Sequence, residues 1–286
     1  MPSSLSPTVD VYSKVMLELP PKIKSLPTPT VRKVNTNDGM SWHVKQTGMG
    51  RDLILIPACE GDSSTYDHLG DLLSSSFRIT TFDMPGFSRT IAPPFSMEDL
   101  TVQILATQVV TLMDELAIPT ATFFSVSTGS LVAMGLVTYY PDRVERIIIH
   151  EAPLHVPQGF RLLKLKDDAH VMHQCREMFP ALLMESRTAW EAMGAEYHAR
   201  MEKNYVTWLR KYIGQLECHH WDEGLLQRPV YWSVGSLNVM GGFYDNIILA
   251  TKLGLEVEIL PCKHYPQLTI PEILAAHIRC CVKDGA

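Results

Sequence analysis

The stretch that decides the fold reads Ala-Thr-Phe-Phe-Ser-Val-Ser-Thr-Gly-Ser-Leu-Val and runs from Ala121 to Val132. Its first six residues are apolar or small, as in a buried parallel strand, and residues 130–140 are typical of a helix. Between them, the run from Ser125 to Gly129 has the small-x-Ser-x-Gly spacing of a tight strand-to-helix turn that exposes a serine hydroxyl. We therefore expect a strand, a sharp turn carrying Ser127, and a helix.

Apolar, β-branched runs recur on both sides of this stretch. Helical patterns lie between the runs, and one of them is predicted to begin at Ser96 as N-cap, with Asp99 three residues later. Such alternation indicates an α/β fold with a mostly parallel, eight-stranded sheet and helices on both faces. The expected strands are 31–35, 41–47, Leu53–Ile56, Phe77–Phe82, Ala121–Val126, Arg146–Ile149, Val230–Val234 and Val257–Leu260.

The alternation stops between residues 154 and 228, where helical stretches such as 186–212 are rich in Met, Trp, Tyr and His. An insertion at the carboxyl end of a strand would cover the crevice in which such sheets bind ligands. We therefore divide the chain into a Ser- and Pro-rich tail (1–30), a first core part (31–153), a helical cap (154–228) and a second core part (229–286).

Composition excludes several classes of partner. The 286 residues carry a net charge of −6 and no basic stretch, which argues against nucleic acid and against an anionic membrane surface. Residues 116–141 are uncharged, but Pro119 and the polar turn favour a strand and a helix over a membrane span. Six scattered cysteines and the absence of a signal-peptide pattern at Met1 indicate a cytoplasmic protein.

Two clusters contain metal-ligand residue types, but neither has a complete ligand spacing. They are His170, His173 and Cys175, and Cys218-His219-His220. Structural zinc sites need four ligands at characteristic spacings. With no glycine-rich phosphate loop either, the sequence predicts neither a metal nor a cofactor.

A serine nucleophile needs a base and a carboxylate partner. His264 follows the strand Val257–Leu260, where a late histidine would serve Ser127 as base. His277 is also late in the chain, but it lies in the pattern of the C-terminal helix. Two carboxylates follow neighbouring strands, Glu151 after 146–149 and Asp245 after 230–234. The spacing leaves both open, although the shorter reach favours Glu151.

An oxyanion hole needs backbone N–H donors. One donor is expected from Thr128, the residue after the nucleophile, and the other from the loop Pro57–Gly61. In that loop we select the N–H of Cys59.

The order of these features resembles the α/β-hydrolase fold: strand, oxyanion loop, the turn Asp83–Arg89, serine elbow, cap and late histidine. Within it, three stretches resemble the zearalenone lactonases, namely 78–89, 189–208 and 243–252. The chain departs from that family at Ser125, where the elbow has glycine, and at Ala58-Cys59, where the oxyanion loop has Asp-Gly. The early cap, 154–180, is the part that matches least.

The resemblance implies that the acid follows the strand before the cap, which selects Glu151. It also implies a substrate-binding tryptophan in the cap, Trp208. Further substrate-binding positions implied by it are Tyr212, Pro153, Phe243 and Asp245.

Together these features predict a cofactor-independent serine lactonase, and the resemblance implies that it opens the ester of a resorcylic acid macrolactone such as zearalenone. Its partner would be this small apolar lactone, and a homodimer is compatible with the resemblance. The alternatives are an esterase for another polyketide or aromatic ester, and a ligand receptor built on a hydrolase fold.

Overall fold

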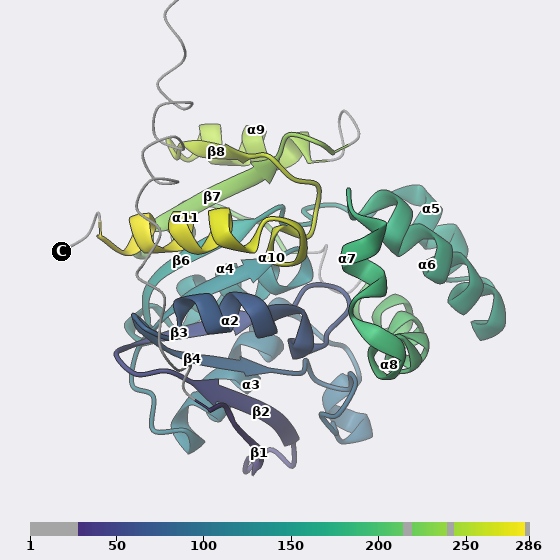
Figure 1. Cartoon of the computed structure of the whole chain (residues 1–286), viewed down its shortest axis with the longest axis horizontal. Helices are drawn as coiled ribbons and strands as arrows, with labels where there is room; N and C mark the ends of the chain where they lie inside the picture. Colours follow the sequence, from purple (N-terminus) through teal and green to yellow (C-terminus); the bar gives the residue numbers. More distant parts are fainter. Residues whose placement is uncertain (1–27, 214–218, 239–242, 284–286) are drawn as a thin grey trace, which may run out of the picture.

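The computed structural model describes residues 28–213, 219–238 and 243–283, so most of the expected tail 1–30 lies outside the described residues. The described chain forms an eight-stranded sheet of order β1-β2-β4-β3-β5-β6-β7-β8 (Figure 1). The strands are β1 (Thr30–Asn35), β2 (Ser41–Thr47), β3 (Arg51–Ile56), β4 (Phe77–Phe82), β5 (Ala121–Val126), β6 (Val144–His150), β7 (Val230–Gly235) and β8 (Val257–Leu260). The eight expected strands are confirmed, with ends that shift by at most two residues.

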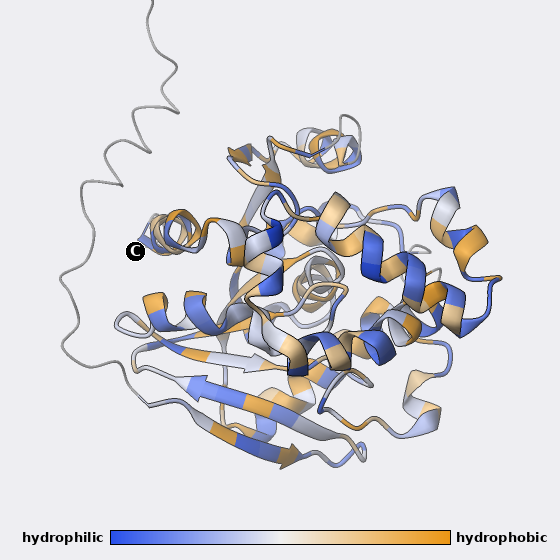
Figure 2. Ribbon diagram, turned by 45° about the vertical axis from the view of Figure 1, so that its right-hand side comes forward, coloured by the Kyte–Doolittle hydropathy of each residue, from blue (hydrophilic) through white to orange (hydrophobic). Residues whose placement is uncertain are grey.

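The sheet is parallel except for β2, which pairs antiparallel with both β1 and β4. Every residue of β5 is buried, whereas five of the six residues of the edge strand β1 are exposed. Hydrophilic and hydrophobic residues mix along β1 and β2, as expected at a solvated edge (Figure 2). The continuous apolar run of β5 therefore marks the centre of the sheet.

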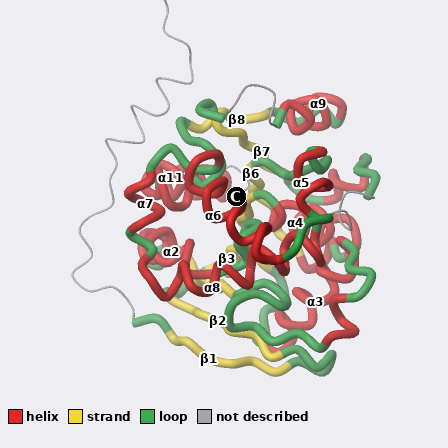
Figure 3. The backbone as a smooth tube through the Cα atoms, turned by 90° about the vertical axis from the view of Figure 1, so that its right-hand side faces the viewer, coloured by secondary structure: helices red, strands yellow, loops and turns green. Residues whose placement is uncertain are grey.

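Helices cover both faces (Figure 3). α2 (Asp67–Leu73) and α11 (Pro271–Lys283) pack together on one face, and α3 (Val102–Glu115) and α4 (Thr128–Tyr139) on the other, where α9 (Tyr244–Lys252) also lies. Residues 128–137 of α4 are all buried, which explains why this helix carries no charge. Within the described parts of the chain, no helix is long and apolar enough to cross a membrane.

The predicted N-cap at Ser96 is wrong. Ser96 lies in a short 3₁₀ turn, η2 (Pro94–Met97), and its hydroxyl donates to the carbonyl of Pro93. α3 is instead capped by Thr101, whose side chain accepts from the N–H of Ile104. Asp99 lies between η2 and α3 and has a positive φ of 49°, which is not a helical conformation, so no helix continues from Ser96 into α3.

Four helices between β6 and β7 form a separate lobe beside the carboxyl ends of the strands (Figure 1). They are α5 (Gln158–Leu163), α6 (Asp168–Leu182), α7 (Arg187–Glu191) and α8 (Gly194–Thr207), and α8 continues into a π-helical turn, η4 (Trp208–Tyr212). The expected helical stretch 186–212 is interrupted at Gly194, which has a φ of 82°. Short segments elsewhere are η1 (Ser63–Tyr66), η3 (Pro141–Arg143), η6 (Glu223–Gln227) and α10 (Pro266–Thr269).

Candidate active site

Ser127 occupies a strained turn between β5 and α4. Its φ of 55° and ψ of −125° lie outside the regions that side-chain-bearing residues ordinarily adopt. The turn is held by a hydrogen bond from Ser127 N–H to the His150 carbonyl at 2.9 Å. Gly129 must lack a side chain, because a Cβ there would lie 2.5 Å from the carbonyl oxygen of Pro57.

The first small position of the elbow is Ser125, which stands where the resembling family has glycine. Its side chain is fully buried, and its carbonyl accepts a hydrogen bond from Ser130 Oγ at 3.1 Å. The same hydroxyl donates to the carbonyl of His150 at 3.1 Å. The serines around the nucleophile therefore tie β5, β6 and the start of α4 together.

His264 follows β8 and meets Glu151, which follows β6. Nδ1 of His264 lies 2.6 Å from Oε2 of Glu151, and both side chains are buried. Because Nδ1 faces a carboxylate, we assign a proton to it, which leaves Nε2 as the nitrogen that can act as the base. Phe243 stacks on the imidazole at a centroid distance of 4.8 Å, and the N–H of His264 donates to the carbonyl of Leu183 in the cap segment.

Glu151 is held in place by several donors. Its Oε1 accepts from the N–H of Gly235 at 2.7 Å and from the side chain of Asn238. Burial alone raises the pKa of Glu151, but attraction to His150 and the hydrogen bond with His264 outweigh it and lower the pKa. Glu151 also has a φ of 50°, an unusual backbone at a strand end.

A second buried histidine, His150, lies beside this pair without belonging to it. Nε2 of His150 is 3.8 Å from Oε2 of Glu151, and Nδ1 is 3.0 Å from the hydroxyl of Ser233. Burial lowers the pKa of His150 to about 4, so the ring is neutral at neutral pH. It therefore attracts Glu151 only under acidic conditions, where the ring is protonated, and adds no positive charge at neutral pH.

The expected oxyanion donors lie around Ser127. Thr128 is the first residue of α4, so its N–H has no acceptor within the helix. Cys59 follows β3 and lines the same hollow as Ser127 and His264. Burial raises the pKa of the Cys59 thiol, which keeps it protonated and unreactive as a nucleophile.

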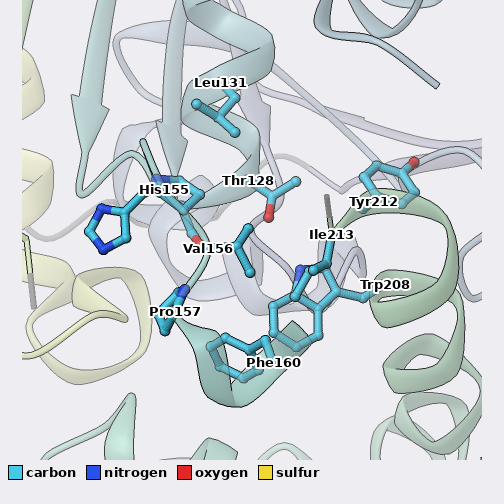
Figure 4. Close-up of a pocket in the computed structure, with 11 residues that line it drawn as sticks. Thr128, Leu131, His155, Val156, Pro157, Phe160, Trp208, Tyr212 and Ile213 are labelled. Carbon is cyan, nitrogen blue, oxygen red and sulfur yellow. The ribbon is translucent and has the colours of Figure 1, made fainter. Parts of the chain in front are cut away.

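Two adjoining hollows open beside Ser127, with volumes of about 440 and 590 Å³. Trp208 and Pro153 line both of them, Tyr212 lines the first, and Phe243 lines the second. Figure 4 shows Trp208 beside Phe160, and the two rings meet edge to face at 5.1 Å. The hydroxyl of Tyr212 donates a hydrogen bond to the carbonyl of Pro85, so Tyr212 offers the hollow the apolar surface of its ring.

Asp245 does not reach His264. It lies in the first turn of α9, and its carboxylate pairs with Nδ1 of His155. Both side chains are about half exposed and both line the larger hollow. The structure thus separates the two carboxylates that the spacing left open, with Glu151 against the imidazole and Asp245 at the rim.

Several residues of the site were not among those expected from the sequence. Asn238 holds Glu151, His155 holds Asp245, and Phe160 supplies part of the aromatic wall. His155 and Asn238 both follow strand ends on the same side of the sheet as Ser127, and this position was the available signal. Phe160 belongs to the early cap, which has no distinctive pattern.

The two candidate metal clusters of the sequence do not form a site in the described parts of the chain. Within them, no group of three or more His, Cys, Asp or Glu side chains is placed to hold a metal. Cys218, from the second cluster, lies outside the described residues.

A strained serine elbow, a late histidine paired with a strand-end acid and a helical cap define the class of protein: this is an α/β hydrolase. The sequence model of the alpha/beta hydrolase fold matches residues 53–191. Zearalenone hydrolase from Bionectria ochroleuca is 33% identical over 256 residues, covering 86% of this chain and 95% of that protein. Zearalenone hydrolase from Cladophialophora bantiana is 34% identical over 247 residues, covering 85% and 93%.

The chain belongs to the zearalenone hydrolase family of α/β hydrolases, and it is a hydrolase of this family. The crystal structure of an enol-lactonase from Burkholderia xenovorans superposes with a TM-score of 0.72 over 88% of this chain and all of that one. Its sequence is 18% identical, so this likeness shows the fold alone.

Proposed function

We propose that the protein is a serine lactonase that opens the ester of a resorcylic acid macrolactone such as zearalenone. The observation that carries the proposal is the 2.6 Å contact between Glu151 and His264 at the wall of a hollow that Ser127 also lines. Two relatives that bear the name zearalenone hydrolase, each at least 33% identical over most of the chain, support the substrate class.

In the first half of the reaction, Ser127 Oγ forms a bond to the ester carbonyl carbon and its proton passes to Nε2 of His264. The negative oxygen that develops receives hydrogen bonds from the N–H groups of Thr128 and Cys59. The ester C–O bond then breaks, and the leaving alkoxide takes the proton from His264. Glu151 stabilises the imidazolium while it exists.

In the second half, a water molecule attacks the acyl-enzyme and gives its proton to His264. The bond from the acyl carbon to Ser127 Oγ breaks, and Ser127 regains that proton. The product is the ring-opened hydroxy acid, heavier than the lactone by one water. No cofactor is needed for this balance.

The shape and chemistry of the pocket support an apolar, aromatic substrate. Trp208 and Phe160 form an aromatic wall (Figure 4), and Pro153 and Val156 line the same hollow. The His155–Asp245 pair at the rim offers polar partners for phenolic hydroxyls.

The test is mass spectrometry of zearalenone incubated with the wild-type protein and with Ser127→Ala. We expect a gain of one water, or the decarboxylated successor of that acid, with the wild type alone. Loss of Ser127 or His264 should lower kcat on the order of 10⁵–10⁶, since the three residues act as a unit. No product with the wild type, or equal product with Ser127→Ala, would contradict the proposal.

An esterase for another polyketide or aromatic ester is the second candidate. One observation favours it: Phe160 and Val156 belong to the early cap, the part of the chain that least resembles the zearalenone lactonases. A panel of resorcylic lactones and simple aromatic esters distinguishes the two candidates by kcat/KM. A ligand receptor without turnover would give no product with any member of the panel.

A further inference from the structure

A second buried carboxyl group lies behind the active site and has no part in the reaction above. Glu60 follows Cys59 in the loop after β3, and its side chain is fully buried. Oε1 accepts hydrogen bonds from the N–H of Ala58 at 3.3 Å and from the hydroxyl of Thr65 at 3.1 Å. Oε2 accepts one from the hydroxyl of Tyr265 at 2.9 Å. A buried acid so surrounded by donors organises the groups around it.

The loop around Glu60 contains the peptide unit whose N–H we assign to the oxyanion hole. That unit joins Ala58 to Cys59, and its carbonyl accepts from the N–H of Gly61 at 3.1 Å. In a trans peptide the C=O and N–H point in opposite directions, so this bond fixes the direction of the Cys59 N–H. The hydrogen bond from Ala58 N–H to Glu60 fixes the peptide unit before it.

Tyr265 connects this loop to the segment that carries the histidine. It follows His264 directly, and its hydroxyl lies 3.3 Å from Sγ of Cys59. A phenol has a single proton, and Tyr265 gives this proton to Glu60. The thiol of Cys59 is therefore the donor to the oxygen of Tyr265. The resulting chain of hydrogen bonds runs from Cys59 through Tyr265 to Glu60.

The cap holds the same loop from outside. Asn204 on α8 is fully buried, and its side-chain nitrogen donates to the carbonyl of Glu60 at 2.8 Å. The same nitrogen lies 2.7 Å from the hydroxyl of Ser88. The loop that carries Cys59 is thus fixed by its own side chain, by the histidine segment and by the cap.

We propose that Glu60, acting through Tyr265 and the N–H of Ala58, is a positioning residue for the oxyanion hole. The inference rests on the proposed function and deepens it. Glu60 does not line either hollow, so its effect falls on the rate of acylation rather than on substrate binding. An oxyanion donor is effective only where it is preorganised, and Glu60 supplies this preorganisation.

The test follows the rate at which a fluorophosphonate labels Ser127, because the phosphonyl transition state also places a negative oxygen in the hole. Glu60→Ala should lower this rate about ten- to hundredfold, a part of what loss of a whole donor costs. Glu60→Gln retains an acceptor for the N–H of Ala58 and should recover most of the rate. Tyr265→Phe should lower it less than Glu60→Ala does.

Tyr66→Phe is the matched control, since it also removes a buried tyrosine hydroxyl, here bonded to the carbonyl of Ile56 at 2.9 Å. Its labelling rate should stay within about twofold of the wild type. On the lactone, kcat of Glu60→Ala should fall with the labelling rate while KM stays within about twofold.

The outcomes separate the two proposals. If the probe does not label the wild type, the serine mechanism fails and the positioning role fails with it. If the wild type is labelled and folded Glu60→Ala reacts equally fast, only the positioning role is overturned. A loss that appears in KM alone, or equally in Tyr66→Phe, also overturns it. Should Glu60→Ala not fold, Tyr265→Phe gives the decision, and a labelling rate equal to that of Tyr66→Phe would overturn the positioning role.

Discussion

Nε of Arg200 on the cap helix α8 lies 2.7 Å from Oδ2 of Asp62, a fully buried carboxylate in the loop that follows β3. Asp62 also accepts from Ser88 Oγ at 2.6 Å and from Arg89 at 3.1 Å. Burial alone raises the pKa of Asp62, but the hydrogen bond from Arg200 and the charge of Arg89 outweigh it and lower the pKa. The cap is therefore joined to the core by a buried charge cluster two residues from Glu60.

Removing Arg200 should loosen the cap. In Arg200→Met, Asp62 keeps its contact with Arg89 but loses the shorter one with Arg200. The free energy of unfolding measured in urea should therefore fall by about 1–3 kcal/mol. KM should also rise, since α8 leads directly into Trp208. Arg187→Met is the control: its pair with Glu191 is exposed and should contribute less than about 1 kcal/mol. Equal effects of the two substitutions would contradict the role of the buried cluster.

Exchange of Glu151 should disable the histidine while leaving the pocket in place. Glu151→Gln keeps the shape but offers an amide to Nδ1 of His264, so kcat should fall about 10³–10⁴-fold. Asp245→Asn should change kcat less than about tenfold and act mainly on KM, because Asp245 pairs with His155 at the rim. Steady-state kinetics on the same lactone tests both. A larger kcat loss in Asp245→Asn than in Glu151→Gln would reverse the assignment.

The sheet could be predicted from the sequence because its central strands are continuous apolar runs of the right length, and β5 is buried at every position. The serine turn could be predicted because glycine alone fits at position 129, against the carbonyls at the end of the neighbouring strand. Both are local properties of the chain. The sequence misplaces the N-cap of α3 because Ser96 and Thr101 carry similar local signals. The positive φ of Asp99 excludes a helix that begins at Ser96.

The choice of acid and the role of Glu60 could not be predicted from local pattern. Spacing did not reveal that α9 carries Asp245 toward His155 rather than toward His264. A glutamate in a loop is usually solvated. Glu60 is instead buried, with its side chain bonded to Tyr265, 205 positions away, and its carbonyl bonded to Asn204 of the cap. Contacts of this range are determined by the tertiary fold.

Truncation of Trp208 should impair substrate binding. Its ring packs on Phe160 and Phe179 and lines both hollows, so Trp208→Ala should raise KM about tenfold or more while circular dichroism shows a folded protein. Trp190→Ala is the comparison, because Trp190 is also buried in the cap but packs on Tyr197 away from the hollows. It should affect stability more than KM. Normal KM and kcat in Trp208→Ala would remove this residue from the pocket assignment.

The ionisation of Glu60 should make stability depend on pH. Burial raises the pKa of Glu60 from 4.5 to about 7, although hydrogen bonds from its own backbone and Tyr265 oppose the rise. Between these values the folded protein keeps a proton that the unfolded chain releases. The stabilisation from this group is therefore complete below pH 4.5 and is lost as pH rises through 7. The phenols of Tyr66, Tyr197 and Tyr265 and the thiol of Cys59 face Glu60, and their pKa values are raised, so they stay neutral.

Glu60→Gln cannot titrate, so it isolates this contribution. The unfolding free energy of the wild type relative to Glu60→Gln should fall by about 2–3 kcal/mol from pH 5 to pH 8. Urea unfolding of both proteins at each pH measures the difference, in which the other titrating groups cancel. A difference that stays constant across this range would show that Glu60 ionises at its ordinary pKa.

Replacing glycine by alanine should destabilise the protein at the serine turn but not at a position with open space around it. A Cβ on Gly129 would lie 2.5 Å from the carbonyl oxygen of Pro57 and 2.6 Å from that of Ile56, so the backbone of β3 would have to move. Gly129→Ala should therefore destabilise the protein by more than about 2 kcal/mol and displace the loop that carries Cys59. Gly159, within α5, has nothing within 4 Å of such a Cβ, and Gly159→Ala should be neutral or stabilise by up to about 1 kcal/mol. Gly129→Ala should lower both the unfolding temperature and the rate of fluorophosphonate labelling, whereas Gly159→Ala should lower neither. Similar behaviour of the two variants would show that β3 and the serine turn are not in the close contact described.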